Sequence, residues 1–352
     1  MVIPATHARA AERILDICRA PSDALVLRLA ILDELRRVIN FDAHAWLLTD
    51  PHTEVGSAPL ADVPFVADLP RLIRLKYLTA VNRWTALASP VGLLRSATED
   101  DPQRSLLWRE LLRGYGVSDV ASVVFRDRFG CWGFLDLWRI DADSRFSDDE
   151  AHLLDGIAGP VTDAVRHAQA STFALAAATP SRGGPAVLML SPSLEVRAQT
   201  TETDDYLRVL VPPDGDGRPI PAGAYNVAAQ LLAVEAGVDD HAPSARVHLA
   251  AGLWLTMRAA RLGGNPQRAG SDIAVTFEPS SPAERLDLFS RCHGLTDREA
   301  QLLGHLAAGL DTRATARAMF LSENTVQDHL KSIFTKSGTR NRRSLLARAL
   351  GR

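Results

Sequence analysis

Apolar residues recur at helical spacing near the start of the chain. In the segment ALVLRLAILDELRRVI they stand three or four positions apart, at Leu25, Leu29, Leu32, Leu35 and Ile39. This spacing places them on one face of an α-helix. We therefore expect a helix here whose apolar face is buried against the rest of its domain.

Strand patterns follow this helix. The run AHAWLLT predicts one strand, and VASVVFRDRFGCWGFLDLWRI has two apolar runs around the polar turn 126–130, which predicts a β-hairpin. FSDDEAHLLDGIAGPVTDAVRHA then opens with Ser147 and, three residues later, Glu150, the pattern of a capping box at a helix N-terminus. Its apolar positions continue at helical spacing, although Gly159-Pro160 should kink or restart the helix.

The middle of the chain resumes after a break. Residues 171–185, STFALAAATPSRGGP, run from a helical tail into a linker rich in proline, glycine and serine. AVLMLSPSLEV then predicts two short strands around a Ser-Pro-Ser turn, PPDGDGRPIP a loop, and AGAYNVAAQLLAVEAG a helix. Two further strands are predicted from apolar residues that share a face: Leu253, Leu255 and Met257 in LWLTMRA, and Ile273, Val275 and Phe277 in IAVTFEP.

The end of the chain predicts four short helices. The first opens with a capping box, Thr296 with Glu299, and Leu295 can pack against Ala300. Four short helices with a tight turn before the third form a helix-turn-helix unit. The other boundary signals, in order, are Gly309 as a stop, Asp311 as the second N-cap, Phe320 as the end of that helix, Ser322 as the third N-cap, Gly338 as its end and Asn341 as the fourth N-cap.

The third of these helices has the dimensions and surface of a DNA-reading helix. Val326, Leu330 and Ile333 stand at i, i+4 and i+7 and should face the core. A short helix fits the major groove, which is about 12 Å wide. Residues 322–325 lie at the helix N-terminus, where free backbone N–H groups favour phosphate. With the apolar stripe turned inward, the outward residues are Gln327, Asp328, Lys331 and Thr335.

Charge is unevenly distributed along the chain. The 352 residues carry a net charge of −3, and 46% of them are hydrophobic and 23% charged. Residues 291–352, however, hold 11 basic and 5 acidic side chains, whereas the remainder holds 28 and 37. A basic module on an acidic body indicates an anionic partner for the C-terminal module alone.

Several classes of function lack their sequence patterns. Three widely separated cysteines and ten histidines show no disulfide or metal-ligand spacing, so we expect no metal and no cofactor. No nucleophile elbow, phosphate loop or H-E-x-x-H motif occurs, and the Asp-Asp pairs fall in loops or helix starts, so we do not expect an enzyme. No apolar run approaches the ~20 residues that span a bilayer, and no signal peptide is evident, so we expect a cytoplasmic protein without membrane contact.

The C-terminal segment resembles the LuxR-type helix-turn-helix of transcription regulators. The resemblance spans residues 295–350 and rests on several short motifs at fixed spacing. These motifs are Leu-Thr-x-Arg-Glu at 295–299, Ala-x-Gly-Leu at 307–310, Ser-x-Asn-Thr-Val-x-x-His-Leu at 322–330, and the closing basic residues Lys336 and Arg342.

The resemblance implies that the third helix reads bases and that the fourth helps to pair two copies on DNA. It implies groove contacts at Gln327, Asp328 and Lys331. The expected partners are double-stranded DNA, a second copy of this chain and RNA polymerase. With the helix N-terminus and nearby basic positions included, the expected DNA-binding residues are Ser322, Asn324, Thr325, Gln327, Asp328, Lys331, Thr335, Lys336, Arg340 and Arg342.

This sequence departs from the family pattern at a few positions. Gln327 and Asp328 replace the usual basic or apolar residues, and Thr315 follows Ala314 in place of a common Glu-Ile pair. Gln pairs with adenine and Asp accepts from the cytosine amino group, but Asp328 also repels phosphate. We therefore predict weaker binding to random DNA and a narrower site preference. The Thr315 hydroxyl is expected to bond a preceding carbonyl.

The region before the C-terminal domain resembles sensor domains. The hairpin followed by FSDDEAHLLDGIAGPVTDAV resembles the end of a GAF domain, and the later order of strand pair, helices and strand pair resembles a PAS-like domain. The resulting fold class is multidomain, with α+β sensor domains, GAF-like and then PAS-like, followed by an all-α four-helix LuxR-type domain. The expected boundaries are a GAF-like domain at 1–170, a linker at 171–185, a PAS-like domain at 186–285 and the DNA-binding domain at 290–352.

The leading hypothesis is a transcription regulator whose N-terminal domains sense a small molecule or mediate dimerisation. Alternatives are a quorum-sensing regulator of acyl-homoserine lactones and an enzyme with an accessory DNA-binding domain. A phosphorylation-controlled receiver is disfavoured because the first 130 residues do not alternate strands and helices. No ligand-binding residues can be named from the sequence, since the aromatic residues of the predicted strands are more often plain core.

Overall fold

The computed structural model divides into two compact units. It describes residues 4–64, 66–140, 144–174, 184–210, 219–250, 252–263 and 271–351. Most of the predicted linker at 171–185 and of the predicted loop at 212–221 lies outside the described residues. The first unit comprises Met1–Val165, Arg182–Val247 and Thr256–Glu278, and the second comprises Arg166–Ser181, His248–Leu255 and Pro279–Arg352.

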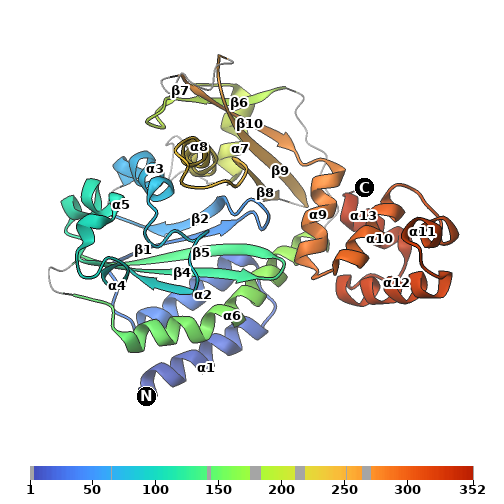
Figure 1. The fold of residues 1–352 in the computed structure, drawn as a ribbon, viewed down its shortest axis with the longest axis horizontal. Helices are drawn as coiled ribbons and strands as arrows, with labels where there is room; N and C mark the ends of the chain where they lie inside the picture. The colour runs from blue at the N-terminus through green and yellow to red at the C-terminus, as the bar shows by residue number, and fades with distance from the viewer. Residues whose placement is uncertain are drawn as a thin grey trace. The chain divides into compact units, whose positions relative to one another are not determined.

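A five-stranded antiparallel sheet forms the centre of the first unit's N-terminal region (Figure 1). The strand order is β2-β1-β5-β4-β3. The predicted strand AHAWLLT is confirmed as β1, and the predicted hairpin is confirmed as β4 and β5, which pair from Asp119–Arg139 down to Asp127–Gly130. The bounds are β1 (Ala43–Thr49), β2 (Gly56–Asp62), β3 (Val91–Leu93), β4 (Asp119–Asp127) and β5 (Gly130–Arg139).

Helices cover both faces of this sheet. Figure 1 shows α1, α2 and α6 along one face, with α3 and α5 over the other. The predicted capping box is confirmed, because Ser147 and Glu150 exchange side-chain and backbone hydrogen bonds. The helices are α1 (Ala5–Arg19), α2 (Ala24–Arg36), α3 (Leu69–Leu78), α4 (Leu94–Ala97), α5 (Leu106–Glu110) and α6 (Asp148–Ser171), with short 3-10 turns at Val66–Asp68, Pro102–Arg104, Leu112–Tyr115 and Thr172–Ala174.

Two details of these helices differ from the sequence prediction. The helix α6 passes through Pro160 without restarting, and it buries apolar residues on both sides of that proline. In α2 the buried face was predicted wrongly, because Leu25 is 50% exposed and Leu29 is 43% exposed. The actual buried stripe runs through Leu27 and Ile31 to the correctly predicted positions Leu32, Leu35 and Ile39. The buried face of this helix is therefore turned by about one residue from the predicted face.

Most of a second five-stranded sheet, in the order β7-β6-β10-β9-β8, also lies in this unit. Three of the four predicted strands and the long helix are confirmed, and the fourth, β7, begins only at Val196, where its predicted segment ends. The helix α7 and the strand β8 were not predicted. The helix α8 is apolar on nearly every face, which is typical of a helix buried on more than one side. The bounds are β6 (Ala186–Leu190), β7 (Val196–Gln199), α7 (Thr201–Leu210), α8 (Ala222–Glu235), β8 (Ser244–Ala250), β9 (Leu253–Arg261) and β10 (Ile273–Pro279).

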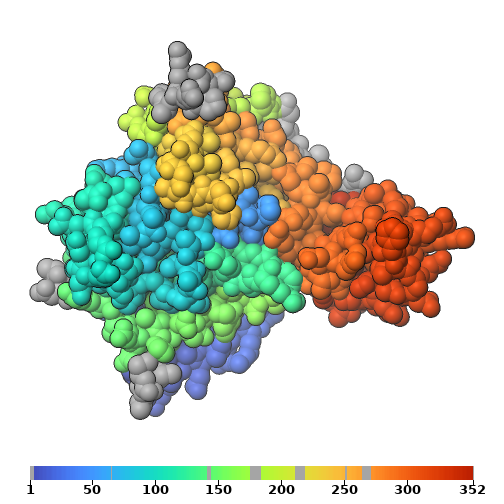
Figure 2. Space-filling view, in the orientation of Figure 1, coloured from blue at the N-terminus to red at the C-terminus, as the bar shows by residue number. Residues whose placement is uncertain are grey.

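Two buried ion pairs join the two sheet regions of the first unit. Arg246 of β8 holds Asp50 with two side-chain contacts of 2.6 and 2.7 Å, and Asp50 is 2% exposed. Arg83, from the loop after α3, contacts Asp239 at 2.7 Å, and each side chain is 2% exposed. The helix α8 packs on α3 and β2, and Figure 2 shows its yellow region against the blue and cyan atoms of the N-terminal region. These contacts make the two sheet regions one packed body.

The second unit is mainly helical and includes a helix that was not predicted, α9 (Pro282–Cys292). A capping box between Ser281 and Glu284 begins it. An aromatic cluster anchors this helix, with Phe173 stacked on Trp254 at 5.6 Å and set edge-on against Phe289 at 5.4 Å between ring centroids. The remaining helices of this unit are α10 (Asp297–Ala307), α11 (Thr312–Met319), α12 (Glu323–Ser337) and α13 (Arg342–Leu350). Among the described helices, none combines the length and hydropathy required to cross a membrane.

Candidate nucleic-acid interface

The boundaries of the last four helices follow the predicted capping residues. Thr296, Asp311, Ser322 and Asn341 each accept a hydrogen bond from the backbone N–H three residues ahead, at 3.3, 2.7, 3.1 and 2.9 Å respectively. Side-chain caps of this kind satisfy backbone donors that the helix itself leaves free. The predicted caps and the four-helix pattern are therefore confirmed.

The turn between α11 and α12 uses an unusual residue. Phe320 adopts the left-handed conformation, with φ 57° and ψ 43°, and it is 95% exposed. A side chain with a Cβ atom is disfavoured in this conformation, which glycine adopts more readily. The tight turn places the N-terminus of α12 directly after the end of α11, as a helix-turn-helix requires.

The helix α12 has one buried and one exposed face. Val326 and Ile333 are fully buried and Leu330 is 6% exposed, so the predicted apolar stripe is confirmed. This stripe packs against α10 and α11. The outward residues are also those predicted, because Gln327, Asp328, Lys331 and Thr335 are all exposed. A 15-residue helix with one free face is suited to the DNA major groove.

Glu299 connects the start of α10 to the middle of α12. Its carboxylate accepts hydrogen bonds from the Thr296 backbone at 2.7 Å, from the Ser332 hydroxyl at 2.6 Å and from the Lys336 ammonium at 2.6 Å. Burial alone would raise the pKa of Glu299, but these hydrogen bonds and the Lys336 charge lower it to about 2. Glu299 therefore fixes the angle at which α12 is presented, a role that the capping pattern alone did not reveal.

The predicted DNA-binding residues fall into two groups. Ser322, Asn324, Gln327, Thr335 and Arg340 are exposed, and Thr325 is half-buried beside the Ser322 hydroxyl. Lys331 is exposed and pairs with Asp328 at 3.1 Å. Two basic side chains are instead engaged inside the domain, since Lys336 binds Glu299 and Arg342 donates to the Leu310 carbonyl. DNA contacts at all ten positions stay predictions.

The sequence of these helices matches a known family model. Residues 293–349 match the model described as "Bacterial regulatory proteins, luxR family". The match covers α10, α11, α12 and α13 up to Ala349, with the N-cap residue of each helix. The C-terminal segment is a LuxR-family domain. This agrees with the resemblance drawn from the motifs of α10 and α12.

Two curated transcription regulators match a short stretch of this chain. The "Probable csgAB operon transcriptional regulatory protein" of Salmonella typhimurium and the "CsgBAC operon transcriptional regulatory protein" of Escherichia coli are each 44% identical over 48 residues. Those residues are 14% of this chain and 22% of each relative. The chain thus spans about a fifth of the length of these relatives, and the likeness concerns that stretch only.

Two solved structures align over nearly the whole chain but weakly. They are Escherichia coli SdiA and SdiA in complex with octanoyl-rac-glycerol, each 12% identical with a TM-score of 0.35. The alignments cover 98% and 100% of this chain and 97% of each SdiA chain. At this TM-score the alignment carries no argument about the regions before the LuxR-family domain.

Among the departures from the family pattern, Thr315 is the one whose polar side chain is buried. It is fully buried on α11, and its hydroxyl finds no hydrogen-bond partner within the described residues. The expected bond to a preceding carbonyl is therefore absent from this structure. A buried hydroxyl without a partner costs about 1–3 kcal/mol.

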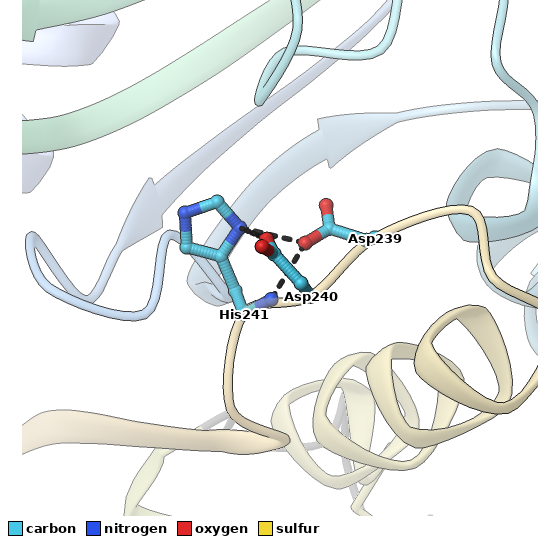
Figure 3. Close-up of side chains that lie close together, drawn as sticks. All are labelled: Asp239, Asp240 and His241. Carbon is cyan, nitrogen blue, oxygen red and sulfur yellow. Dashed lines mark hydrogen bonds and ion pairs between the residues drawn. The ribbon is translucent and has the colours of Figure 1, made fainter.

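A separate polar cluster lies in the first unit, at Asp239, Asp240 and His241 (Figure 3). Asp239 accepts hydrogen bonds from the backbone and ring of His241 at 2.8 and 2.6 Å, and from Thr85 at 2.8 Å, in addition to its Arg83 contact. Burial alone would raise the pKa of Asp239, but these hydrogen bonds and the Arg83 charge hold it below its usual range. The carboxylate is thus occupied as an anchor for Arg83, and we assign the cluster to structure rather than to metal binding.

Proposed function

We propose that this chain is a DNA-binding transcription regulator whose helix α12 reads the major groove. The observation that carries the proposal is the exposed face of α12 within a LuxR-family domain, presented by a capped N-terminus and the Glu299 contacts. In this proposal the N-terminal N–H groups of α12 hold a phosphate, and Asn324, Gln327, Asp328 and Lys331 approach base edges. A regulator that acts on chromosomal DNA works in the cytoplasm.

We further propose that two copies bind an inverted repeat. A two-fold dimer matches a palindromic site whose half-sites lie one helical turn, or about 10 base pairs, apart. α13 and the sensor regions are the elements proposed to hold the dimer, with RNA polymerase as a further partner at the promoter. The Arg342 guanidinium donates to the Leu310 carbonyl in the turn before α11. In this proposal Arg342 affects DNA binding indirectly, by holding that turn in place.

The regions before the LuxR-family domain are proposed to sense a small molecule, in GAF-like and PAS-like domains with the boundaries predicted from the sequence. Support comes from the two sheets, which repeat one strand order: numbered within each sheet, both read 2-1-5-4-3. The quorum-sensing alternative differs only in the effector. It is tested by adding acyl-homoserine lactones to the DNA-binding assay below.

The proposal is tested by selecting bound duplexes from a random DNA pool with the full chain. We expect enrichment of an inverted repeat. Replacing Gln327→Ala should relax the preference at one base position in each half-site, because a base contact specifies sequence. Arg208→Ala, an exposed change on α7, is the control and should leave the selected repeat unchanged. Recovery of unselected sequences by the wild-type chain would overturn the proposal.

A further inference from the structure

The first unit contains an apolar cavity of about 210 Å³ that is partly open to solvent. A single water molecule needs roughly 10–15 Å³ of such space, so the cavity is large enough for an organic molecule. Its walls come from β1, β5, α3 and α5 on one side. The side chains that form most of this wall are Ala45, Leu47, Leu72, Leu107, Phe134 and Trp138.

The second sheet region of the same unit completes the cavity. Ile220, Ala222 and Asn226, from α8 and the residues just before it, form the opposite wall. Gly56 on β2 leaves room for the Leu47 side chain, since a Cβ atom there would lie 2.7 Å from it, whereas the Asn226 amide oxygen would be in ordinary contact at 3.4 Å. The cavity therefore exists only when both sheet regions are packed together.

The cavity contains one charged pair whose charges cancel. The Lys76 ammonium lies 2.7 and 3.0 Å from the two Asp136 oxygens, and these side chains are 13% and 4% exposed. Asp136 is further held by the Ser122 hydroxyl at 2.7 Å. An ammonium has three N–H donors, so Lys76 keeps one that Asp136 does not use.

The remaining polar groups of the lining are uncharged. The Tyr77 hydroxyl accepts from the Gly56 backbone N–H at 2.9 Å, and burial raises the pKa of Tyr77 above its usual value, which keeps the phenol neutral. Asn226 donates its amide N–H to the Ala222 carbonyl at 2.8 Å. A charged ligand would find no unpaired opposite charge here, and burying an unpaired ion is costly.

We propose that this cavity binds a neutral amphiphile, a molecule with an apolar body and one hydrogen-bond-accepting group such as an alcohol or a carbonyl. The apolar body lies against Leu72, Phe134 and the α8 wall, and the accepting group meets the free N–H of Lys76. This inference deepens the small-molecule part of the proposed function and rests on it. It also makes α8 a ligand-contacting element, so the bound molecule stabilises the packing of the two sheet regions.

The proposal is tested with three probes that share a ten-carbon chain: 1-decanol, decanoate and decyltrimethylammonium, each below its aggregation threshold. Titration calorimetry of the full chain should show 1-decanol bound at least about ten-fold more tightly than either ion. The melting temperature should rise with 1-decanol alone. Equal affinity for all three probes, tighter binding of an ion, or no binding of 1-decanol would overturn the proposal.

Variants at both walls locate the binding. Ala222→Phe fills the cavity from α8, and Ala61→Phe blocks it from an exposed position on β2, so folding is preserved in the second case. Each should lower 1-decanol affinity about ten-fold or more, whereas Ala236→Phe, at the exposed end of α8, should not. Lys76→Met combined with Asp136→Leu should weaken 1-decanol about three-fold or more by removing the hydrogen bond. Unchanged affinity in the Ala61 variant overturns the assignment of the cavity.

The same preparations are assayed for DNA binding to separate this inference from the proposed function. Absence of 1-decanol binding by the wild-type chain, with its sequence-specific DNA binding intact, would overturn only the ligand site. Binding of 1-decanol without any sequence-specific DNA binding would overturn the regulator and leave the ligand site standing.

Discussion

Arg83 and Asp239 stand 156 positions apart in the sequence and form an ion pair of 2.7 Å from which solvent is almost excluded. The Arg83 guanidinium also donates to the Gln230 side chain at 3.0 Å and lies 4.8 Å from the Trp84 ring centroid. This one side chain thus connects the loop after α3 to α8 and to the loop that follows it. The two sheet regions are held together by this contact and by Arg246–Asp50.

Replacing Asp239→Asn should destabilise the first unit strongly. The change leaves Arg83 buried without its counter-charge, and breaking a buried pair costs about 3–5 kcal/mol in free energy of unfolding. Urea unfolding followed by tryptophan fluorescence measures this, because five of the six tryptophans lie in the first unit. The same substitution at Asp204, whose exposed partner is Arg208, should cost no more than about 1 kcal/mol. Equal losses in the two variants would refute the anchoring role of Arg83.

The second unit should lose stability in mild acid because of His293. Burial lowers the pKa of His293 to about 4 from an ordinary value of 6.5. Between pH 6.5 and pH 4, His293 therefore binds a proton in the unfolded chain but not in the folded chain. The contribution of neutral His293 to the free energy of unfolding is fully present above pH 6.5 and is lost as the pH falls toward 4. Hydrogen exchange of α10 amides between pH 7 and pH 4 measures it.

His293→Gln should flatten this pH profile, since glutamine does not titrate. His152→Gln, at an exposed position of α6, is the control and should leave the profile unchanged. An identical pH dependence in wild type and His293→Gln would assign the acid sensitivity to other groups. Burial also lowers the pKa of His248 to about 4, so His293→Gln should remove part of the slope rather than all of it.

Thr315→Val should stabilise the LuxR-family domain. The substitution keeps the side-chain shape and removes a fully buried hydroxyl that lacks a partner, which favours the folded state by about 1 kcal/mol or more. Thermal unfolding measures the change. Thr339→Val is the matched control, because the Thr339 hydroxyl is buried and bonded to Ser337 at 2.8 Å, and its removal should destabilise. Destabilisation by both substitutions would show that Thr315 has a partner in solution.

Structural features that are determined by residues close together in the sequence could be predicted best. The β4–β5 hairpin and the caps of α10 to α13 were predicted, because turn and capping residues act within a few positions. The capping box at Ser281 and Glu284 is the same kind of signal and was missed, although the sequence contains it. The face that α2 buries was predicted with a rotation of one residue, since tertiary packing sets that angle.

Features that depend on distant residues could not be predicted. Nothing near Arg83 in the sequence points to Asp239, and the cavity wall formed by Asn226 depends on how α8 packs. In the LuxR-family domain the outward residues of α12 could be predicted from the helical period. The ion pair between Lys336 and Glu299 could not. Such pairings appear only once the chain is folded.

Asp328→Ala should change the balance between specific and random DNA binding. The substitution removes a negative charge that repels phosphate and frees Lys331, which Asp328 holds at 3.1 Å. Affinity for scrambled DNA should rise by roughly three-fold or more, and affinity for the selected repeat should rise less or fall. Fluorescence anisotropy with both duplexes at one salt concentration measures the ratio. Equal tightening on the two duplexes would contradict a base-reading role for Asp328.

The central claim is that α12 binds a specific DNA site, and footprinting tests it most directly. The full chain is bound to DNA upstream of its own gene and of neighbouring genes and digested with DNase across a salt series. The account predicts a protected inverted repeat whose protection weakens as the salt concentration rises, because phosphate contacts release counterions. Absence of any protected site at low salt, both alone and with cell extract added to supply an effector, would contradict it.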